Sequence, residues 1–154
     1  MKNLLIIASL TLSLSGFAAS DKMLAAVATV ESSNNPRAIG DNGLARGAFQ
    51  MHSPAWEQVS DLRKAKGKPV YSWFWNATDP VISKEYASDY IDILSSSLQK
   101  KMGRVPEPWE VYAAYNRGLQ AFVKSEYDYA NQPYSTQRAC RKIAILTRTS
   151  IPQR

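Results

Sequence analysis

Beyond residue 20, apolar residues recur mainly three and four positions apart, and strict alternation of apolar and polar residues is scarce. This spacing places apolar side chains along one face of an α-helix. The longest regular stripe consists of Tyr86, Tyr90, Leu94 and Leu98, within a helix that we expect to reach about Met102. The pattern therefore predicts a mainly α fold.

The first helix is predicted over residues 22–32, and the run Asn34-Asn35-Pro36 ends it because proline cannot continue a helix. Gly40, Gly43 and Gly47 make the following stretch too rich in glycine for another helix. We expect a single helical domain in which this stretch forms at most a small β-hairpin or an irregular glycine-rich loop.

Prolines mark the places where later helices begin. Ser53-Pro54 and Thr78-Asp79-Pro80 each combine a side chain that can cap a helix with a proline suited to its first turn. Residues 66–78, between these two starts, are expected to form a loop with large aromatic side chains. A further helix is predicted after Pro106 and Pro108 and is ended by Gly118, and two more are predicted near residues 119–130 and 135–148.

The first twenty residues differ from the rest of the chain. Lys2 is their only charged residue, an almost wholly apolar run follows it, and small residues come next. This order is typical of a secretory signal peptide, with cleavage after Ala18 or after Ser20. We expect a signal peptide (residues 1–20) and an exported domain (residues 21–154), periplasmic or extracellular and without stable membrane insertion.

The net charge and the cysteine content of the chain limit the partners and the kinds of site that it can have. The formal charge of the 154 residues is +6, and removing the leader deletes only the charge of Lys2. A basic exported domain suits an anionic partner such as the cell wall, whereas no block of basic residues interleaved with aromatics suggests nucleic acid. Cys140 is the only cysteine, which excludes an intrachain disulfide, and we expect it to be a small core residue.

His52 is the only histidine, which leaves little material for a histidine metal cluster or a Ser-His-Asp triad. We therefore expect chemistry without a metal or cofactor, and a surface or capping role for His52. An acid/base candidate is Glu31, which falls on the apolar stripe of the first helix at its C-terminal end. Burial would raise the pKa of this carboxyl group and keep it protonated. The stripe alone leaves open a glutamate that simply turns to solvent.

Three blocks in order resemble the lysozyme-like lytic transglycosylase family, which includes soluble lytic transglycosylases and the goose-type lysozyme-like catalytic domain. The blocks are Glu31-Ser32-Ser33-Asn34-Asn35-Pro36, then Gly43, Gly47 and Phe49-Gln50-Met51, and finally Ala113-Ala114-Tyr115-Asn116-Arg117-Gly118. The resemblance covers about residues 22–125. It implies a lysozyme-like fold and cleavage of the β-1,4 bond between N-acetylmuramic acid and N-acetylglucosamine in peptidoglycan.

The resemblance assigns Glu31 the role of catalytic acid/base, which protonates the leaving oxygen and then takes the proton of the muramic acid C6 hydroxyl to give a 1,6-anhydro product. Tyr115 would hydrogen-bond that carboxyl group and hold its rotamer, and Asn116 would lie on the same wall. Gln50 resembles the glutamine that faces the cleft. Ser32 matches the Glu-Ser pair, although a serine there can equally brace the backbone.

Two departures from the family pattern matter. The spacing from Glu31 to Gln50 is one residue longer than usual, and Gly40-Asp41-Asn42-Gly43 stands where the family often has a serine. Asp41 is either a turn residue or a second carboxylate near the sugar, which would allow hydrolysis by a muramidase mechanism. Trp73 and Trp75 either stack on sugar faces or cover the core.

A non-catalytic wall-binding or assembly protein is an alternative of another class. The size of the domain and its expected export also suggest local remodelling of the wall, for a secretion or conjugation apparatus that spans the envelope or for delivery by a phage.

Overall fold

The computed structural model describes residues 19–151, so most of the predicted signal peptide lies outside the described residues. The chain is mainly α, as predicted. Its helices are α1 (Asp21–Ser32), α2 (Ser53–Ala65), α3 (Trp73–Asn76), α4 (Pro80–Met102), α5 (Pro108–Arg117), α6 (Leu119–Lys124) and α7 (Tyr134–Thr147). None of the helices within residues 19–151 combines the length and apolar character needed to cross a bilayer.

The glycine-rich stretch forms a small antiparallel sheet in the order β1-β2-β3. Its strands are β1 (Ile39–Gly40), β2 (Ala45–Arg46) and β3 (Met51–His52), and a 3₁₀ turn, η1 (Asp41–Gly43), connects the first two. Ala45 pairs with both Gly40 and His52. The expected small hairpin is therefore present, extended by a third short strand.

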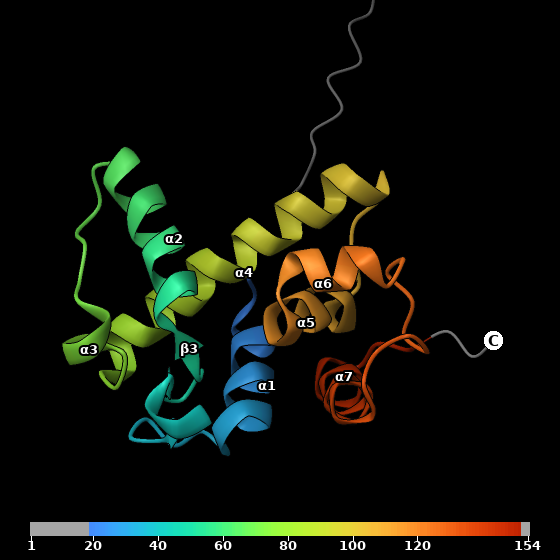
Figure 1. The fold of residues 1–154 in the computed structure, drawn as a ribbon, viewed down its shortest axis with the longest axis horizontal. Helices are drawn as coiled ribbons and strands as arrows, with labels where there is room; N and C mark the ends of the chain where they lie inside the picture. The colour runs from blue at the N-terminus through green and yellow to red at the C-terminus, as the bar shows by residue number, and fades with distance from the viewer. Residues whose placement is uncertain (1–18, 152–154) are drawn as a thin grey trace, which may run out of the picture.

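The long helix α4 runs across the molecule (Figure 1). The helices α2 and α3 and the strands lie toward its first residues, and α5, α6 and α7 lie toward its last. Helix α1 lies between these two groups, in contact with α4 and α7. The last turn of α1 is thereby placed between the sheet and the C-terminal helices.

The core follows the predicted apolar stripes. All four residues of the α4 stripe are buried: Tyr86, Tyr90, Leu94 and Leu98. Trp56 of α2 stacks on Tyr86, with ring centroids 3.7 Å apart. Cys140 is fully buried as expected, and its Sγ lies 3.6 Å from the carbonyl oxygen of Trp109. One core thus joins the helices on both sides of α4.

The predicted cap of α4 is confirmed, whereas the predicted cap of α2 is wrong. The Asp79 side chain accepts hydrogen bonds from the backbone N–H groups of Val81 and Ile82, which caps α4 as predicted. The predicted capping by Ser53 is wrong, because Ser53 already lies inside α2 and its hydroxyl donates to the carboxylate of Glu57. Ser53 is the first residue of the helix, one position past the place from which a capping side chain accepts from the free N–H groups.

Two predicted boundaries also need correction. Residues 66–78 are not entirely a loop, because the aromatic segment forms the single turn of α3. The helix predicted over 119–130 ends at Lys124, where Ser125 donates its hydroxyl to the carbonyl of Phe122 and the chain turns. Side-chain bonds to nearby carbonyl groups compete with helix continuation, and sequence periodicity does not detect them.

Gly47 is a point of close backbone approach. Its φ is +76°, and a Cβ atom there would collide with the carbonyl oxygen of Ala77, just before α4. Gly43 has a φ of +94° but faces open space. The glycine-rich region is therefore packed against the α3–α4 connection at Gly47, whereas Gly43 has open space beside it.

We predict that Gly47→Ala destabilises the protein by about 2 kcal/mol or more beyond the effect of Gly43→Ala. Both substitutions strain a left-handed backbone, but only the first adds a steric clash with a backbone carbonyl. Chemical denaturation of the two variants measures the difference. Equal losses of stability would contradict the close packing at Gly47.

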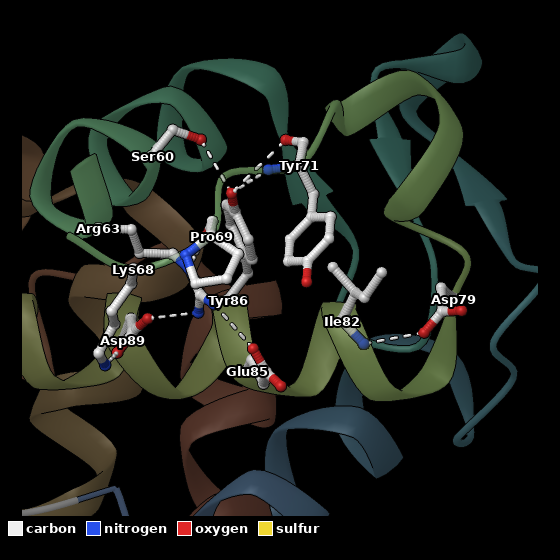
Figure 2. A network of polar contacts seen from close by, with 10 residues as sticks. All are labelled: Ser60, Arg63, Lys68, Pro69, Tyr71, Asp79, Ile82, Glu85, Tyr86 and Asp89. Carbon is white, nitrogen blue, oxygen red and sulfur yellow. Dashed lines mark hydrogen bonds and ion pairs between the residues drawn. The ribbon is translucent and has the colours of Figure 1, made fainter.

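A polar network fixes the segment that leads from α2 to α3 (Figure 2). The Arg63 guanidinium, whose side chain is only 5% exposed, donates to Glu85, Asp89 and the carbonyl of Pro69. The Tyr86 hydroxyl accepts from the backbone N–H of Tyr71 at 2.9 Å. The segment before the aromatic turn is thus tied to both α2 and α4.

Candidate active site

Glu31 lies one residue before the end of α1, on a half-buried part of the helix. Ser33 ends the helix in the left-handed conformation, and its N–H donates to the carbonyl groups of Ala28 and Thr29. The rest of this helix face is buried, including Leu24 and Ala28. The glutamate therefore occupies the point at which an apolar stripe reaches the surface.

The Glu31 carboxyl group is held by Tyr112, a residue of α5 that is 81 positions later in the chain. The Tyr112 hydroxyl donates to Glu31 Oε1 at 2.8 Å. Burial, followed by the neighbouring Glu31, raises the pKa of Tyr112 far above its usual value, so the phenol keeps its proton. A neutral donor on a buried ring fixes the rotamer of the carboxyl group.

The pKa of Glu31 is raised above its ordinary value of 4.5. Burial is the largest cause, and the charge of Asp41 adds to it. Hydrogen bonding to Tyr112 and Asn116 and the charge of His52 act in the opposite direction but do not cancel it. Burial disfavours the ionised form because it removes water from the carboxylate, so the group retains its proton to higher pH. This is the property that a general acid needs.

We predict that Tyr112→Phe raises the pKa of Glu31 further, because it removes a hydrogen bond that favours the carboxylate. The fall in activity at high pH should then begin at a higher pH, while the maximal rate falls roughly tenfold as the carboxyl loses its orientation. A pH–rate profile of the two proteins tests this. A shift of the fall to lower pH would contradict the assigned contact.

The hydrogen bond expected between Tyr115 and Glu31 is not present. The Tyr115 hydroxyl donates instead to the backbone carbonyl of Phe49 at 2.7 Å. Its ring is nearly parallel to that of Tyr112, with centroids 6.4 Å apart. The two tyrosines are three residues apart on α5, so their side chains extend side by side. One reaches the end of α1, and the other reaches the residue before Gln50.

Sequence reasoning therefore chose the wrong tyrosine for the carboxyl contact. Tyr112 and Tyr115 lie on the same helical face, and this spacing could have drawn attention to both. Which hydroxyl meets Glu31 depends on how α5 is rotated against α1, a property set by the whole core.

Ser32 braces the backbone, one of the two roles considered for it. Its hydroxyl donates to the carbonyl of Ala48 at 2.8 Å and accepts from the N–H of Asn35 at 3.0 Å. These bonds join the end of α1 to the turn that follows it and to the segment before β3. Ser32 thus holds the region around Glu31 together.

Gln50 has a similar bracing contact. Its Nε2 donates to the carbonyl groups of Gly47 at 2.8 Å and Ala38 at 3.2 Å, and its φ is +46°. A Cβ atom on Gly40 would collide with the Gln50 amide oxygen. The amide nitrogen of Gln50 is therefore engaged within the glycine-rich region.

Asn116 lies with Glu31 and Tyr112, and interaction with its amide lowers the pKa of both groups. Its Oδ1 accepts a hydrogen bond from the Thr136 hydroxyl of α7 at 2.9 Å. This bond orients the amide with its NH₂ group away from Thr136. The structure thus places the Asn116 amide close to the Glu31 carboxyl group, as the family resemblance implies.

Asp41 pairs with His52, its neighbour across the small sheet. Asp41 Oδ2 lies 2.8 Å from His52 Nε2, and the two side chains are 67% and 46% exposed. Asp41 also has a φ of +48°, as residues in tight turns often do. His52 occupies the capping position of α2 but makes no side-chain capping bond. Both charges act on Glu31, yet neither side chain contacts it.

The two tryptophans of the aromatic turn α3 differ in burial and in their contacts. Trp73 donates its indole N–H to the carbonyl of Met51 at 2.8 Å, and the Arg46 guanidinium lies 4.9 Å from its ring centre. Trp75 is 76% exposed. Trp73 therefore packs against the core, one of its two expected roles, whereas Trp75 is exposed and packs edge-on against Phe74, with ring centroids 4.8 Å apart.

A cavity of about 1260 Å³ lies elsewhere, where α5 and α7 meet the end of α4. Glu31 is not among its lining residues. The contacts of Glu31 with Tyr112 and Asn116 therefore lie outside this cavity.

Comparison with protein families identifies the family of the chain. The model of the transglycosylase SLT domain matches residues 14–137, which is most of the chain and includes the helices that carry Glu31 and Tyr112. A search of curated proteins found no match.

Proposed function

Since the chain belongs to the transglycosylase SLT family, we propose that it cleaves the β-1,4 bond between N-acetylmuramic acid and N-acetylglucosamine in peptidoglycan. Glu31 is the general acid/base, and the products carry 1,6-anhydro-muramyl ends. The observation that carries this proposal is the half-buried Glu31 carboxyl group with a raised pKa, held by the Tyr112 hydroxyl at 2.8 Å.

The proposed reaction has two steps. Protonated Glu31 first gives its proton to the glycosidic oxygen while the bond from that oxygen to the muramic acid C1 breaks. The Glu31 carboxylate then accepts the proton of the C6 hydroxyl, whose oxygen forms a new bond to C1. No water is consumed, and Glu31 ends in its starting protonated state. The 2-acetamido group of the sugar can stabilise the positive charge that develops at C1.

The contacts of Asp41 favour a mechanism that uses Glu31 alone. A second catalytic carboxylate must act on the sugar or on a water, but the Asp41 carboxylate is engaged by His52 at 2.8 Å. Within the described residues, the only charge contribution from a carboxylate among the largest causes of the raised pKa of Glu31 comes from Asp41.

Hydrolysis remains the second candidate because the charge of Asp41 reaches Glu31 and raises its pKa. Mass analysis of digested peptidoglycan distinguishes the two reactions. Anhydro-muramyl ends are the expected result, whereas reducing ends that contain an added water would establish a muramidase.

We predict that Asp41→Asn retains at least about a tenth of the activity and still forms anhydro ends. Removing its negative charge lowers the pKa of Glu31, so the fall in activity at high pH should begin at a lower pH. The pH–rate profile and product masses measure both effects. A loss of several hundredfold or more would instead assign Asp41 to the chemistry.

We also propose that the protein is exported and acts in the periplasm or outside the cell, where peptidoglycan lies. Its partner beyond the glycan strands is then an envelope-spanning secretion or conjugation apparatus that needs a local opening in the wall. Fractionation of cells tests the location, and a mild pull-down tests the partner. Recovery in the cytoplasm, or deletion effects limited to bulk wall turnover, would defeat the respective proposal.

A further inference from the structure

Asp92, a half-buried residue in the middle of α4, has an unusual partner. Its Oδ1 accepts a hydrogen bond from the backbone nitrogen of Ala19 at 2.8 Å. Among the described residues, no lysine, arginine or histidine pairs with this carboxylate. Its neighbours one turn away on α4 include Asp89 and Ser95 but no basic residue.

The other charged groups around this place are already paired. Arg63 from α2 binds Glu85 and Asp89, and Lys68 also binds Asp89 (Figure 2). Lys84 of α4 pairs with Asp21 of α1. The lysine of α1, Lys22, donates to the carbonyl of Thr147 at the end of α7. The Asp92 carboxylate is therefore the acidic group of this region that lacks a cation.

Ala19 and Ser20, which precede α1, make contacts that hold the beginning of this helix in place. Ala19 packs against the core, and the Ser20 hydroxyl accepts from the N–H of Met23 at 3.1 Å, which caps α1. The Ser20 carbonyl also accepts from the N–H of Leu24. Within the described residues 19–151, Ala19 and Ser20 thus already make specific contacts before α1 begins.

We propose that the leader is cleaved between Ala18 and Ala19, and that the α-ammonium group created on Ala19 forms an ion pair with Asp92. Hydrolysis by a leader peptidase consumes one water, leaves a carboxylate on Ala18 and leaves an amine on Ala19 that takes up a proton. The small residues Gly16 and Ala18 before this bond suit such a peptidase. This inference rests on the proposed export and is independent of the proposed glycan chemistry.

The other site considered, after Ser20, would remove structure. It would delete the Ala19 contact and the Ser20 cap, and it would leave Asp92 without its partner. It would also place a new positive charge on Asp21, at the N-terminus of α1, where the helix dipole disfavours a cation.

The first test is the N-terminus of the exported protein. The full chain is produced in a bacterial host that cleaves secretory leaders, recovered from the periplasmic fraction, and examined by intact mass and N-terminal sequencing. Ala19 is the expected first residue. A chain that begins at Asp21 overturns the inference and leaves both export and glycan cleavage standing. A chain that keeps its leader overturns the inference and counts against export.

The second test compares Asp92→Asn with Asp61→Asn in the processed protein. Asp61 is an exposed acidic residue of α2 without a described partner, which makes it a matched control. The ion pair raises the pKa of the α-amino group above its unfolded value of about 7.7–8.0. Its stabilisation is therefore complete below that range and is lost as pH rises through the folded value.

Asp92→Asn should lower the melting temperature by roughly 3 °C or more at pH 6. The loss at pH 9.5 should be clearly smaller, while the control changes little at either pH. The nearby groups Asp21, Lys84, Glu85, Asp89, Arg63 and Lys68 are present in both variants, so their titration is common to the comparison. An equal loss at both pH values, or none at pH 6, overturns the ion pair.

Discussion

Glu31→Gln is expected to lower glycan cleavage by about 100- to 10,000-fold, the usual contribution of a general acid/base. Glutamine has nearly the same shape and can still accept the Tyr112 hydrogen bond, but it can neither give nor take the proton. Release of soluble muropeptides from purified peptidoglycan measures the loss. Retained activity, or an unchanged biological effect in the cell, would favour a wall-binding or assembly role without catalysis.

The same variant should also be more stable than the unaltered protein at neutral pH. The pKa of Glu31 is higher in the folded state than its ordinary value of 4.5, so ionising this carboxyl group destabilises the fold. This destabilisation is absent below the ordinary value and grows as pH rises above it. Thermal unfolding at pH 4 and pH 7 should therefore show a gain in stability for Glu31→Gln only at the higher pH. The measurement tests the environment of Glu31 without any substrate.

Arg63→Met is expected to cost about 3–5 kcal/mol of folding free energy, the typical effect of removing one partner from a buried ion pair. The Arg63 side chain is 5% exposed and its main acidic partner, Asp89, is 16% exposed. Methionine can fill much of the space but leaves the Asp89 carboxylate and the Pro69 carbonyl without this donor. Urea denaturation of the two proteins measures the loss.

Lys64→Met provides the control, because Lys64 is exposed on the same helix and loses the same charge. It should change the free energy of unfolding by about 0.5 kcal/mol or less. Adding Asp89→Asn to Arg63→Met should recover part of the loss if the stranded carboxylate causes it. No recovery would show that Arg63 acts mainly through packing or through the Pro69 carbonyl.

Local signals in the sequence predicted much of the fold. The stripe of α4 and its cap at Asp79 were confirmed because both depend on residues within a few positions of one another. The Arg63 network was not predicted, since it joins α2, α4 and the segment between them. Ser53 failed as a cap because it is already the first residue of α2, and His52 occupies the capping position.

In the candidate site, too, local signals predicted some features and missed those that depend on packing between distant segments. Glu31 was placed by the apolar stripe and by the family motif, and the raised pKa of its carboxyl group follows from the burial that the stripe predicts. Its partner was misplaced by one helical turn, because the choice between Tyr112 and Tyr115 depends on the packing of α5 against two separate segments. The sequence indicated the helix but not its rotation.

Cys140 gives the protein a built-in reporter of conformational opening. Burial raises the pKa of this thiol to about 12, so almost none of it is thiolate at neutral pH. The thiolate is the form that attacks thiol reagents, and here a reagent can reach Cys140 only when α7 separates from α5. The rate at which a reagent labels the chain under native conditions therefore measures how often these two helices part, without any engineered probe.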